Sequence, residues 1–533
     1  MAELGDNLFP QHELALESAT ESVWMHTDKA EAWMLEGQEA EGALGLSTLS
    51  GNTTAEVAIV GAGITGMTLA LLLQRSGVDV AVLDAHPVGY GVSGLNSGHL
   101  TNLLLDMKYK NILAAFGEDA TRAVALGLTQ AIDHIEQMVT DYRIDCQFKR
   151  LPGYLYTEHP SELNLLQEEY ESASIAGLSV NRTFNVPLPF PVEEAVHVAD
   201  QADFHPLKYV RGLAREFIRN GGRIHTQTRV VTIDHESHEG GIPVKTDFGS
   251  VLAQNVVLAT HTPIGFRPAI QTRLEAYRSY IIGFRTDDMI GDALFWDTQE
   301  PYHYIRSVTD EKGPLLILGG ADHRTGEKRD TERCFQQLEN YAAERFTVSS
   351  WDYRWSAQMF NPADGLPYIG KLSGVYIATG YSGEGLTFGT LAAQILHDEL
   401  VGRSHYLADI LTPNRAKPLA SVGGFLAENV GTMAHFVGDR LRKADVLEPE
   451  QIPVGEGAIC KLHGKKVAVY HGMEGVFHFL SPVCTHMACI VGWNSAEKSW
   501  DCPCHGARYD AFGQVINGPA VNALKPINPD EEA

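Results

Sequence analysis

The sequence predicts an α/β dinucleotide-binding domain of the Rossmann type, an α+β domain inserted into it, and a C-terminal all-β domain. A short β-rich run from Val57, a GxGxxG turn and a helical segment predict the first domain. Alternating apolar segments between Arg273 and about Trp351 predict an antiparallel sheet in the second. From about Glu448 the chain is rich in short β-type runs, which predicts the third.

Length and charge limit the class of protein. A chain of 533 residues is long enough for two or three domains. Its 67 acidic and 41 basic residues give a formal charge of −26, which argues against nucleic acid or an anionic membrane surface as a partner. The segment from Met1 to Asp6 is acidic, whereas a secretion signal begins with basic residues that are followed by an apolar stretch. No segment of the sequence has the length and hydrophobicity of a membrane span. We therefore expect a cytoplasmic protein.

The strand-turn-helix unit is a complete dinucleotide fingerprint. Gly61 makes the tight turn, Gly63 lets a pyrophosphate approach the backbone, and Gly66 lets the helix pack against the sheet. A second strand, Val80 to Leu83, ends in Asp84, which we expect to bind ribose hydroxyls. This fingerprint fits FAD and NAD equally, so the cofactor has to be chosen on other grounds.

The segment from Gly91 to His99 resembles the flavin-adjacent loop of the D-amino-acid oxidase, glycine oxidase and sarcosine oxidase superfamily. The resemblance implies FAD in a glutathione-reductase-type fold. Leu95 stands where some relatives attach a histidine to the flavin, so we expect non-covalent FAD. His99 is a candidate active-site residue, or alternatively a helix cap. The residues that the resemblance places near the flavin are Ser93, Asn96, Ser97 and Gly98.

A second segment resembles the C-terminal flavin motif of the same superfamily. Asp364 to Gly370 is followed by a strand, Tyr376 to Thr379, and by glycine-rich chain at the start of a helix. Backbone amides and the helix dipole there can stabilise negative charge on the flavin. The residues we assign to cofactor binding in this motif are Gly380, Gly383, Gly385, Leu386 and Thr387.

The predicted inserted sheet supplies the candidate substrate residues. Tyr304 and Arg306 occupy a strand where amino-acid-oxidising relatives place a tyrosine and an arginine that binds the substrate carboxylate. The alternative is an arginine exposed on an edge strand.

Two short loops near the C-terminus each offer one thiolate and one imidazole. Cys484 and His486 lie in the first loop, and Cys502 and His505 in the second. A structural zinc site usually pairs like ligands along the chain, whereas mixed loops suit a two-iron cluster with two Cys on one iron and two His on the other. The loops resemble the Rieske [2Fe–2S] centre, and a zinc knuckle is the alternative interpretation.

The resemblance extends to Rieske proteins of the cytochrome bc type. It implies a disulfide between Cys489 and Cys504, a tyrosine at Tyr509 hydrogen-bonded to a cluster cysteine, and a covering loop at Gly518 to Ala520. Ala507 replaces a serine that donates a hydrogen bond to the cluster in high-potential members. We therefore expect a potential below the upper end of the roughly −150 to +300 mV Rieske range.

The remaining segments complete the predicted organisation. Regular structure is expected to begin near Glu56, and an apolar stripe from Val422 to Leu441 predicts a helix that docks the last domain. Cys146, Cys334 and Cys460 are expected to be buried. The predicted ranges are a mobile tail at 1–17, an oxidoreductase unit at 18–411 (FAD-binding about 55–104, 201–262 and 352–411; substrate domain about 105–200 and 263–351), a linker with docking helix at 412–447, and the Rieske domain at 448–533.

No second strand-GxGxxG-helix unit is present in the sequence, so we expect electrons to enter from a substrate rather than from NADH. The resemblance implies oxidation of a C–N bond of an amine or amino acid, possibly N-methylated, with electrons passing from FAD to the cluster and on to an external acceptor, either a protein or a quinone. The alternatives are an electron-transfer module without its own small substrate and a non-catalytic redox sensor.

Overall fold

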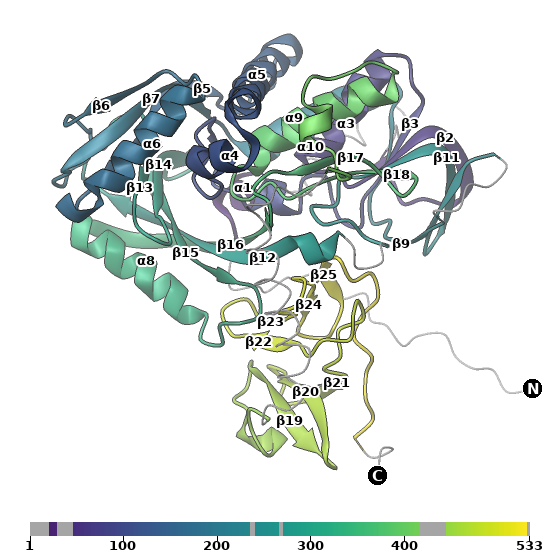
Figure 1. The fold of residues 1–533 in the computed structure, drawn as a ribbon. Helices are drawn as coiled ribbons and strands as arrows, with labels where there is room; N and C mark the ends of the chain where they lie inside the picture. Colours follow the sequence, from purple (N-terminus) through teal and green to yellow (C-terminus); the bar gives the residue numbers. More distant parts are fainter. Residues whose placement is uncertain (1–20, 29–45, 235–239, 266–269, 416–443, 530–533) are drawn as a thin grey trace, which may run out of the picture.

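The computed structural model describes most of the chain as one large α/β body with a smaller β domain beneath it (Figure 1). The predicted tail at 1–17 and the predicted docking helix from Val422 to Leu441 lie outside the described residues. No helix among the described residues is long and apolar enough to cross a membrane. The described residues are 21–28, 46–234, 240–265, 270–415 and 444–529.

The first nine-stranded sheet contains the predicted fingerprint. Strands β2 (Gly51–Val60) and β3 (Val80–Leu83) pair in parallel, and α3 (Ile64–Arg75) connects them as expected. β2 also pairs in parallel with β11 (Gly249–Leu258), which places β2 inside the sheet. The other strands are β1 (Leu46–Ser47), β8 (Arg223–His225), β9 (Val230–Ile233), β10 (Ile242–Thr246), β17 (Tyr368–Leu372) and β18 (Val375–Thr379).

Buried helices cover this sheet. Helix α3 packs against α9 (Gly385–Leu400), and both are apolar around most of their circumference, as expected for helices enclosed by other elements. Helix α5 (Glu118–Tyr142) packs on α9, and the residues of its predicted apolar stripe, Ile132, Ile135 and Met138, are all buried. The α7 helix (Pro206–Arg219) packs against α3 on another side.

The second nine-stranded sheet is the predicted substrate-domain sheet. Its core is the antiparallel set β12 (Leu274–Thr286), β15 (Gly313–Arg324) and β14 (Tyr304–Asp310). β14 begins two residues later than the predicted strand, because His303 donates its backbone N–H to Asp297 Oδ1. The other strands of this sheet are β4 (His99–Leu100), β5 (Lys149–Thr157), β6 (Val180–Thr183), β7 (Glu194–Asp203), β13 (Leu294–Asp297) and β16 (Val348–Pro362). The α-helices of the flavoprotein part not yet named are α4 (Tyr109–Phe116), α6 (Leu163–Ile175), α8 (Glu332–Arg345) and α10 (Ala408–Leu411).

Regular structure begins earlier than predicted. The short helix α1 (Val23–Thr27) precedes Glu56, and its Trp24 is almost completely buried. Ser22 Oγ donates to Gly94 O at 2.6 Å, and Trp24 Nε1 donates to Asn96 O at 2.6 Å. The expectation that structure starts near Glu56 is therefore wrong, because this segment is stabilised by contacts with a loop about seventy residues away.

The C-terminal domain is all β, as predicted. One sheet is the meander β19 (Gly457–Leu462), β20 (Lys465–His471) and β21 (Phe477–Leu480), in which Val469 faces Phe479 across the expected hairpin. The other sheet has four short strands, β22 (Gly492–Asn494), β23 (Ser499–Asp501), β24 (Arg508–Asp510) and β25 (Val515–Asn517).

A buried network of ion pairs joins β12 to the C-terminal domain, which lies beneath this strand in Figure 1. Arg278 of β12 is 1% exposed and lies 2.5 Å from the carboxylate of Glu497 in the C-terminal domain. Arg508 donates to the same carboxylate at 2.8 Å and to Asp501 at 2.9 Å. Gln358 Nε2 of β16 also donates to Gly506 O at 2.8 Å. The domain is thus held against the sheet by desolvated polar contacts.

Loss of the shared carboxylate in this network should destabilise the protein. We expect Glu497→Gln to lower the free energy of unfolding by about 3 kcal/mol, since two buried guanidinium groups lose a compensating charge. Glu168→Gln, which breaks the exposed pair with Lys110, is the matched control and should cost less than about 1 kcal/mol. Urea unfolding followed by fluorescence measures both, and equal effects would contradict the assignment.

Candidate active site and metal centre

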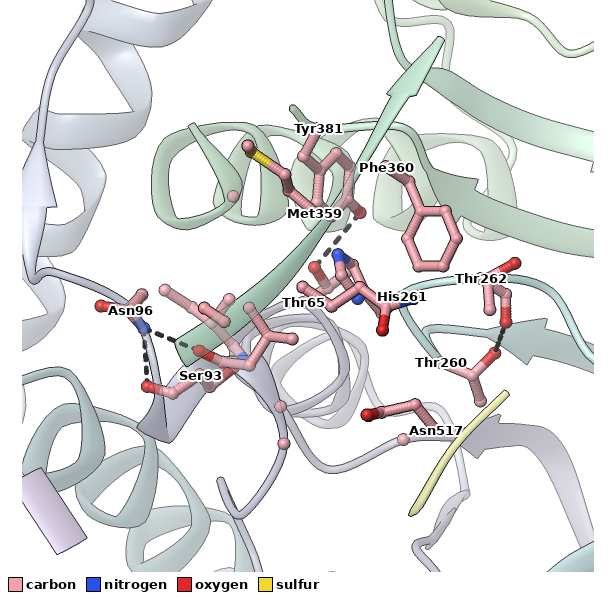
Figure 2. Close-up of a pocket in the computed structure, with 18 of the residues that line it drawn as sticks. Thr65, Ser93, Asn96, Thr260, His261, Thr262, Met359, Phe360, Tyr381 and Asn517 are labelled. Carbon is pink, nitrogen blue, oxygen red and sulfur yellow. Dashed lines mark hydrogen bonds between the residues drawn. The ribbon is translucent and has the colours of Figure 1, made fainter. Parts of the chain in front are cut away.

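A cavity of about 290 Å³ lies where the two sheets and the C-terminal domain meet. Its walls come from the fingerprint turn, the loop after β3, the start of α9, the inner strands of the second sheet and the chain after β25. Figure 2 shows one part of it, with Ser93 and Asn96 on one side, Met359 and Phe360 of β16 on another, and Asn517 of the C-terminal domain below.

The fingerprint glycines shape one end of the cavity. Gly61 has φ +112°, and a Cβ there would lie 2.4 Å from Ala259 O. A Cβ on Gly66 would lie 1.8 Å from Gly61 O, so this glycine allows the turn and helix to close. Gly61 and Gly63 line the cavity, whereas Gly66 lies behind it. The cavity therefore has the narrow backbone approach that a pyrophosphate needs beside the start of α3.

Asp84 closes the same turn and also lines the cavity. Its Oδ2 accepts from Ala62 N at 2.7 Å, and its Oδ1 accepts from His86 N at 2.8 Å. Burial raises the pKa of this carboxyl to about 6, although both backbone donors lower it. Each carboxylate oxygen keeps a second lone pair that could accept a hydrogen bond from a ribose hydroxyl. Ribose binding by Asp84 stays a prediction.

The loop after β3 is held by its own polar side chains. Ser93 Oγ accepts from Ile64 N at 3.0 Å, and Asn96 Nδ2 donates to Val92 O and Ser93 O (Figure 2). Ser93, Asn96 and Ser97 line the cavity, and Gly98 does not. Gly98 has φ +74°, and a Cβ there would lie 2.8 Å from Phe204 O, so its contribution is to the packing behind the wall.

The C-terminal glycine-rich segment supplies the opposite wall. Gly383, Gly385 and Leu386 line the cavity at the first turn of α9, where free N–H groups and the helix dipole favour a negatively charged ligand edge. Gly380, with φ +81°, and Thr387, which donates to Thr101 O at 3.1 Å, support this wall from behind. The cavity thus has a glycine-rich turn and a helix N-terminus at each end, before α3 and before α9, and this arrangement fits FAD.

Aromatic side chains and a histidine line the part of the cavity under the second sheet. His99 Nδ1 lies 2.7 Å from Ser97 Oγ, and its buried Nε2 has no hydrogen-bond partner. Burial and the charge of Arg306 lower the pKa of His99 well below its usual range, so the ring is neutral. Tyr304 also lines the cavity, and its hydroxyl lies 3.2 Å from Ser279 Oγ.

Arg306 lies outside the lining of this cavity. Its Nη1 donates to Gly98 O at 2.7 Å and to Phe204 O at 3.3 Å, and its Nη2 pairs with Asp203 at 3.1 Å. The guanidinium also lies 5.5 Å from the Trp24 ring of α1. These contacts hold the guanidinium behind the cavity wall, and carboxylate binding by Arg306 stays a prediction. The alternative of a solvent-exposed arginine is wrong, because Arg306 is buried.

Three acidic residues near the cavity escaped the sequence interpretation. Glu384 is 5% exposed and lines the cavity; its Oε1 accepts from Leu105 N at 2.9 Å, and its buried Oε2 has no hydrogen-bond partner among the described residues. Asp322 also lines the cavity, with a buried, unpartnered Oδ1. Asp106 lies just behind, accepting from Gly383 N at 3.0 Å. The available signal was the position of Glu384, between two glycines that the sequence assigns to cofactor binding.

The two Cys-His loops meet in the C-terminal domain. The Cys484 and Cys502 thiols are both buried, and the His486 and His505 rings lie 5.1 Å apart. Both ring nitrogens of His505 are buried, and no residue in the described part of the chain forms a hydrogen bond with them. Unpartnered imidazole nitrogens next to two buried thiols fit a Rieske cluster, in which His and Cys each supply two ligands.

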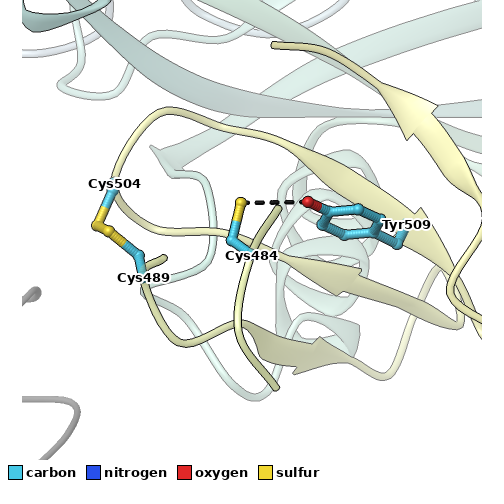
Figure 3. The surroundings of a disulfide bond; sticks show 4 residues. All are labelled: Cys484, Cys489, Cys504 and Tyr509. Atoms are coloured by element: carbon cyan, nitrogen blue, oxygen red, sulfur yellow. Dashed lines mark hydrogen bonds between the residues drawn. A yellow bond between two sulfur atoms is a disulfide. The ribbon is translucent and has the colours of Figure 1, made fainter. Parts of the chain in front are cut away.

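The expected surroundings of the cluster are present. Cys489 and Cys504 form the predicted disulfide, and Tyr509 Oη lies 3.2 Å from Cys484 Sγ (Figure 3). The sulfurs of Cys489, Cys502 and Cys504 lie within 4.8 Å of one another. Two of these three are joined in the disulfide, so only Cys502 among them can be a thiolate ligand. Cys146, Cys334 and Cys460 are buried, as predicted.

The cluster domain forms part of the wall of the dinucleotide cavity. The cavity is lined by Gly518 and Ala520 of the predicted covering loop and by Asn517, the residue before it. On the opposite side of the contact, Gln358 lines the cavity and donates to Gly506 O, one residue after His505. A single side chain thus reaches from the cavity wall to the second cluster loop.

Comparisons with known proteins agree with this architecture. The family model for FAD dependent oxidoreductases (DAO) matches residues 56–399, and the model for the Rieske [2Fe-2S] domain matches residues 442–528. The chain is 28% identical over 487 residues to the "Putative Rieske 2Fe-2S iron-sulfur protein YhfW" of Bacillus subtilis (strain 168), with 90% of this chain and 95% of the relative covered.

Two further comparisons each cover about two thirds of this chain. Gamma-glutamylputrescine oxidoreductase of Escherichia coli (strain K12) is 27% identical over 372 residues, covering 67% of this chain and 85% of the relative. The crystal structure of glycine oxidase from Geobacillus kaustophilus superposes with a TM-score of 0.58 at 18% identity, covering 68% of this chain and 100% of that one. Since the DAO model spans more than half of the chain, the protein belongs to the FAD-dependent oxidoreductase (DAO) family and carries a C-terminal Rieske [2Fe–2S] domain.

Proposed function

We propose that the protein oxidises a C–N bond of an amine or amino acid in this cavity and that the electrons leave through the Rieske domain to an external acceptor, a protein or a quinone. One observation carries the proposal: the same cavity is lined by the dinucleotide motifs, by the substrate-domain sheet and by the covering loop of the cluster domain. Bound FAD would supply a hydride acceptor for the carbon next to the substrate nitrogen, and a Rieske cluster would supply an acceptor of single electrons.

The chain's own residues have to bind the substrate and exclude water. Tyr304, Trp296 and the neutral His99 form an aromatic wall in which an alkyl chain can be desolvated. The free Nε2 of His99 can accept a hydrogen bond from a substrate N–H. The loop at Gly518 closes the side that faces the cluster domain. Such a wall orients the reacting carbon and keeps bulk water away.

The alternative function is an electron-transfer module that serves a protein partner and has no small substrate. It would not need buried polar groups without partners inside the cavity, because each such group has a desolvation cost. The unpartnered atoms of His99, Asp322 and Glu384 therefore favour a cavity that binds a polar small molecule. A non-catalytic redox sensor would differ from both of these functions because it would show no turnover.

Anaerobic mixing of the holoprotein with N-methyl amino acids, primary amino acids and simple amines tests the proposal. At least one compound should bleach the flavin absorbance, and the EPR signal of a reduced mixed-ligand cluster should follow. The His505→Ser variant, which lacks one predicted cluster ligand, should still bleach but give no cluster signal. If no amine reduces either centre while dithionite reduces both, the electron-transfer alternative is favoured.

The hydrogen bond at Cys484 gives a second prediction. Tyr509→Phe removes a donor to the thiolate sulfur, so the reduced cluster is less stabilised and its potential should fall. A net hydrogen bond of about 1 kcal/mol corresponds to roughly 40 mV for one electron. Redox titration followed by EPR measures the shift, with Tyr470→Phe as a control on another tyrosine of the same domain. An unchanged potential in Tyr509→Phe would refute the assigned role.

A further inference from the structure

Resting on the proposed function, we infer that the substrate is a diamine, whose second cationic group is held by Glu384 and Asp322 while the other nitrogen is oxidised. The inference concerns the chemical class of the substrate. It begins from the acidic end of the cavity, where both carboxylates line the wall and each has one buried oxygen without a hydrogen-bond partner.

Glu384 has one carboxylate oxygen that accepts no hydrogen bond from any described residue. Glu384 is 5% exposed, and its other oxygen is fixed by Leu105 N at 2.9 Å, so the side chain has a defined position. A buried carboxylate oxygen without a donor is costly unless something supplies one. Because no described residue donates to Oε2, a donor from a ligand in the cavity would satisfy it.

A third acidic group, Asp106, also raises the pKa of the two carboxylates at this end of the cavity. Asp106 accepts from Tyr302 Oη at 3.2 Å and from Gly383 N at 3.0 Å, directly beside Glu384. Burial and the Asp106 charge raise the pKa of Glu384 to about 8, and burial raises that of Asp106 to about 6. Burial and the same Asp106 charge also raise the pKa of Asp322 well above its usual range. A bound cation reverses these shifts and so is attracted to the site.

Basic side chains that could neutralise these carboxylates are placed elsewhere. Of the described residues that line the cavity, Arg229 alone is a lysine or arginine, and it lies near His86 and Asp84 at the fingerprint end. Lys108 is close enough to affect Asp106, but it pairs with the exposed Glu300 at 3.3 Å and does not line the cavity.

This arrangement selects against an amino acid substrate. A substrate carboxylate at this end would face two acidic side chains and no cation, which is unfavourable in a desolvated site. Arg306, the residue expected to bind such a group, is engaged with backbone carbonyls and Asp203. An ammonium group, in contrast, offers three donors to the free carboxylate oxygens.

Binding of guanidines to the oxidised holoenzyme tests the inference without turnover, because a guanidinium nitrogen has no free lone pair to support hydride removal. The probes are 1,4-diguanidinobutane, butylguanidine and 4-guanidinobutanoate, and binding is read from the perturbed flavin absorbance. The dication should bind more tightly than butylguanidine by about tenfold or more, and the zwitterion should bind most weakly. Equal affinity for the dication and the zwitterion in the wild-type protein would overturn the inference.

Substitutions test whether Glu384 and Asp322 cause the preference for the dication. Glu384→Gln retains an acceptor for Leu105 N and should remove most of the preference for the dication, as should Asp322→Asn independently. Glu300→Gln removes an equal charge from a side chain that is 81% exposed and should change the affinity less than about twofold. FAD content checks that each variant is folded. If both buried variants keep the wild-type preference, or if neither folds and the wild-type probes show no preference, the inference fails.

Oxidisable probes separate this inference from the proposed function. Anaerobic flavin bleaching by 1,4-diaminobutane, with N-methylglycine inactive, supports both. Bleaching by N-methylglycine but not by any diamine overturns the diamine inference and leaves amine oxidation standing. If no amine of either kind bleaches a flavin that dithionite reduces, the proposed function fails, whatever the guanidines bind.

Discussion

The contact between the C-terminal domain and β12 of the flavoprotein is the constraint on which the site depends. Arg278 and Glu497 approach to 2.5 Å in an almost fully buried position, and Arg508 neutralises the same carboxylate from within its own domain. Buried pairs of this kind depend on close geometry, since a small displacement leaves a charge uncompensated. The network therefore specifies one docked position, in which Gly518 and Ala520 complete the cavity wall.

Charge compensation distinguishes the structural residues from the candidate functional ones. Asp364 is buried and bonded by Arg415 at 2.6 Å, and Asp203 is paired with Arg306. In the cavity, Glu384 has no such partner. Because Asp364 and Asp203 are each paired with an arginine and Glu384 is not, the protein accepts a cost in stability at Glu384. Such a cost is expected at a site where a ligand supplies the missing charge.

Local patterns predicted the cofactor-binding parts well. The glycines at Gly61 and Gly66, and the disulfide between Cys489 and Cys504, depend on short motifs, and the structure has them as expected. The role of Arg306 could not be predicted in the same way, because its partners are Phe204 O, Asp203 and the ring of Trp24, which are far away in the sequence. Helix α1 and the docking of Arg278 on Glu497 depend on similarly distant contacts.

The position of Gln358 links the two redox parts of the chain. Its side chain lines the cavity, and its amide nitrogen donates to Gly506 O in the loop that carries His505. A Cβ on Gly506 would lie 2.5 Å from that same amide nitrogen, so a larger residue at this position would displace the Gln358 side chain. The contacts that fix the docked position of the C-terminal domain therefore also fix the position of the second cluster loop relative to the cavity.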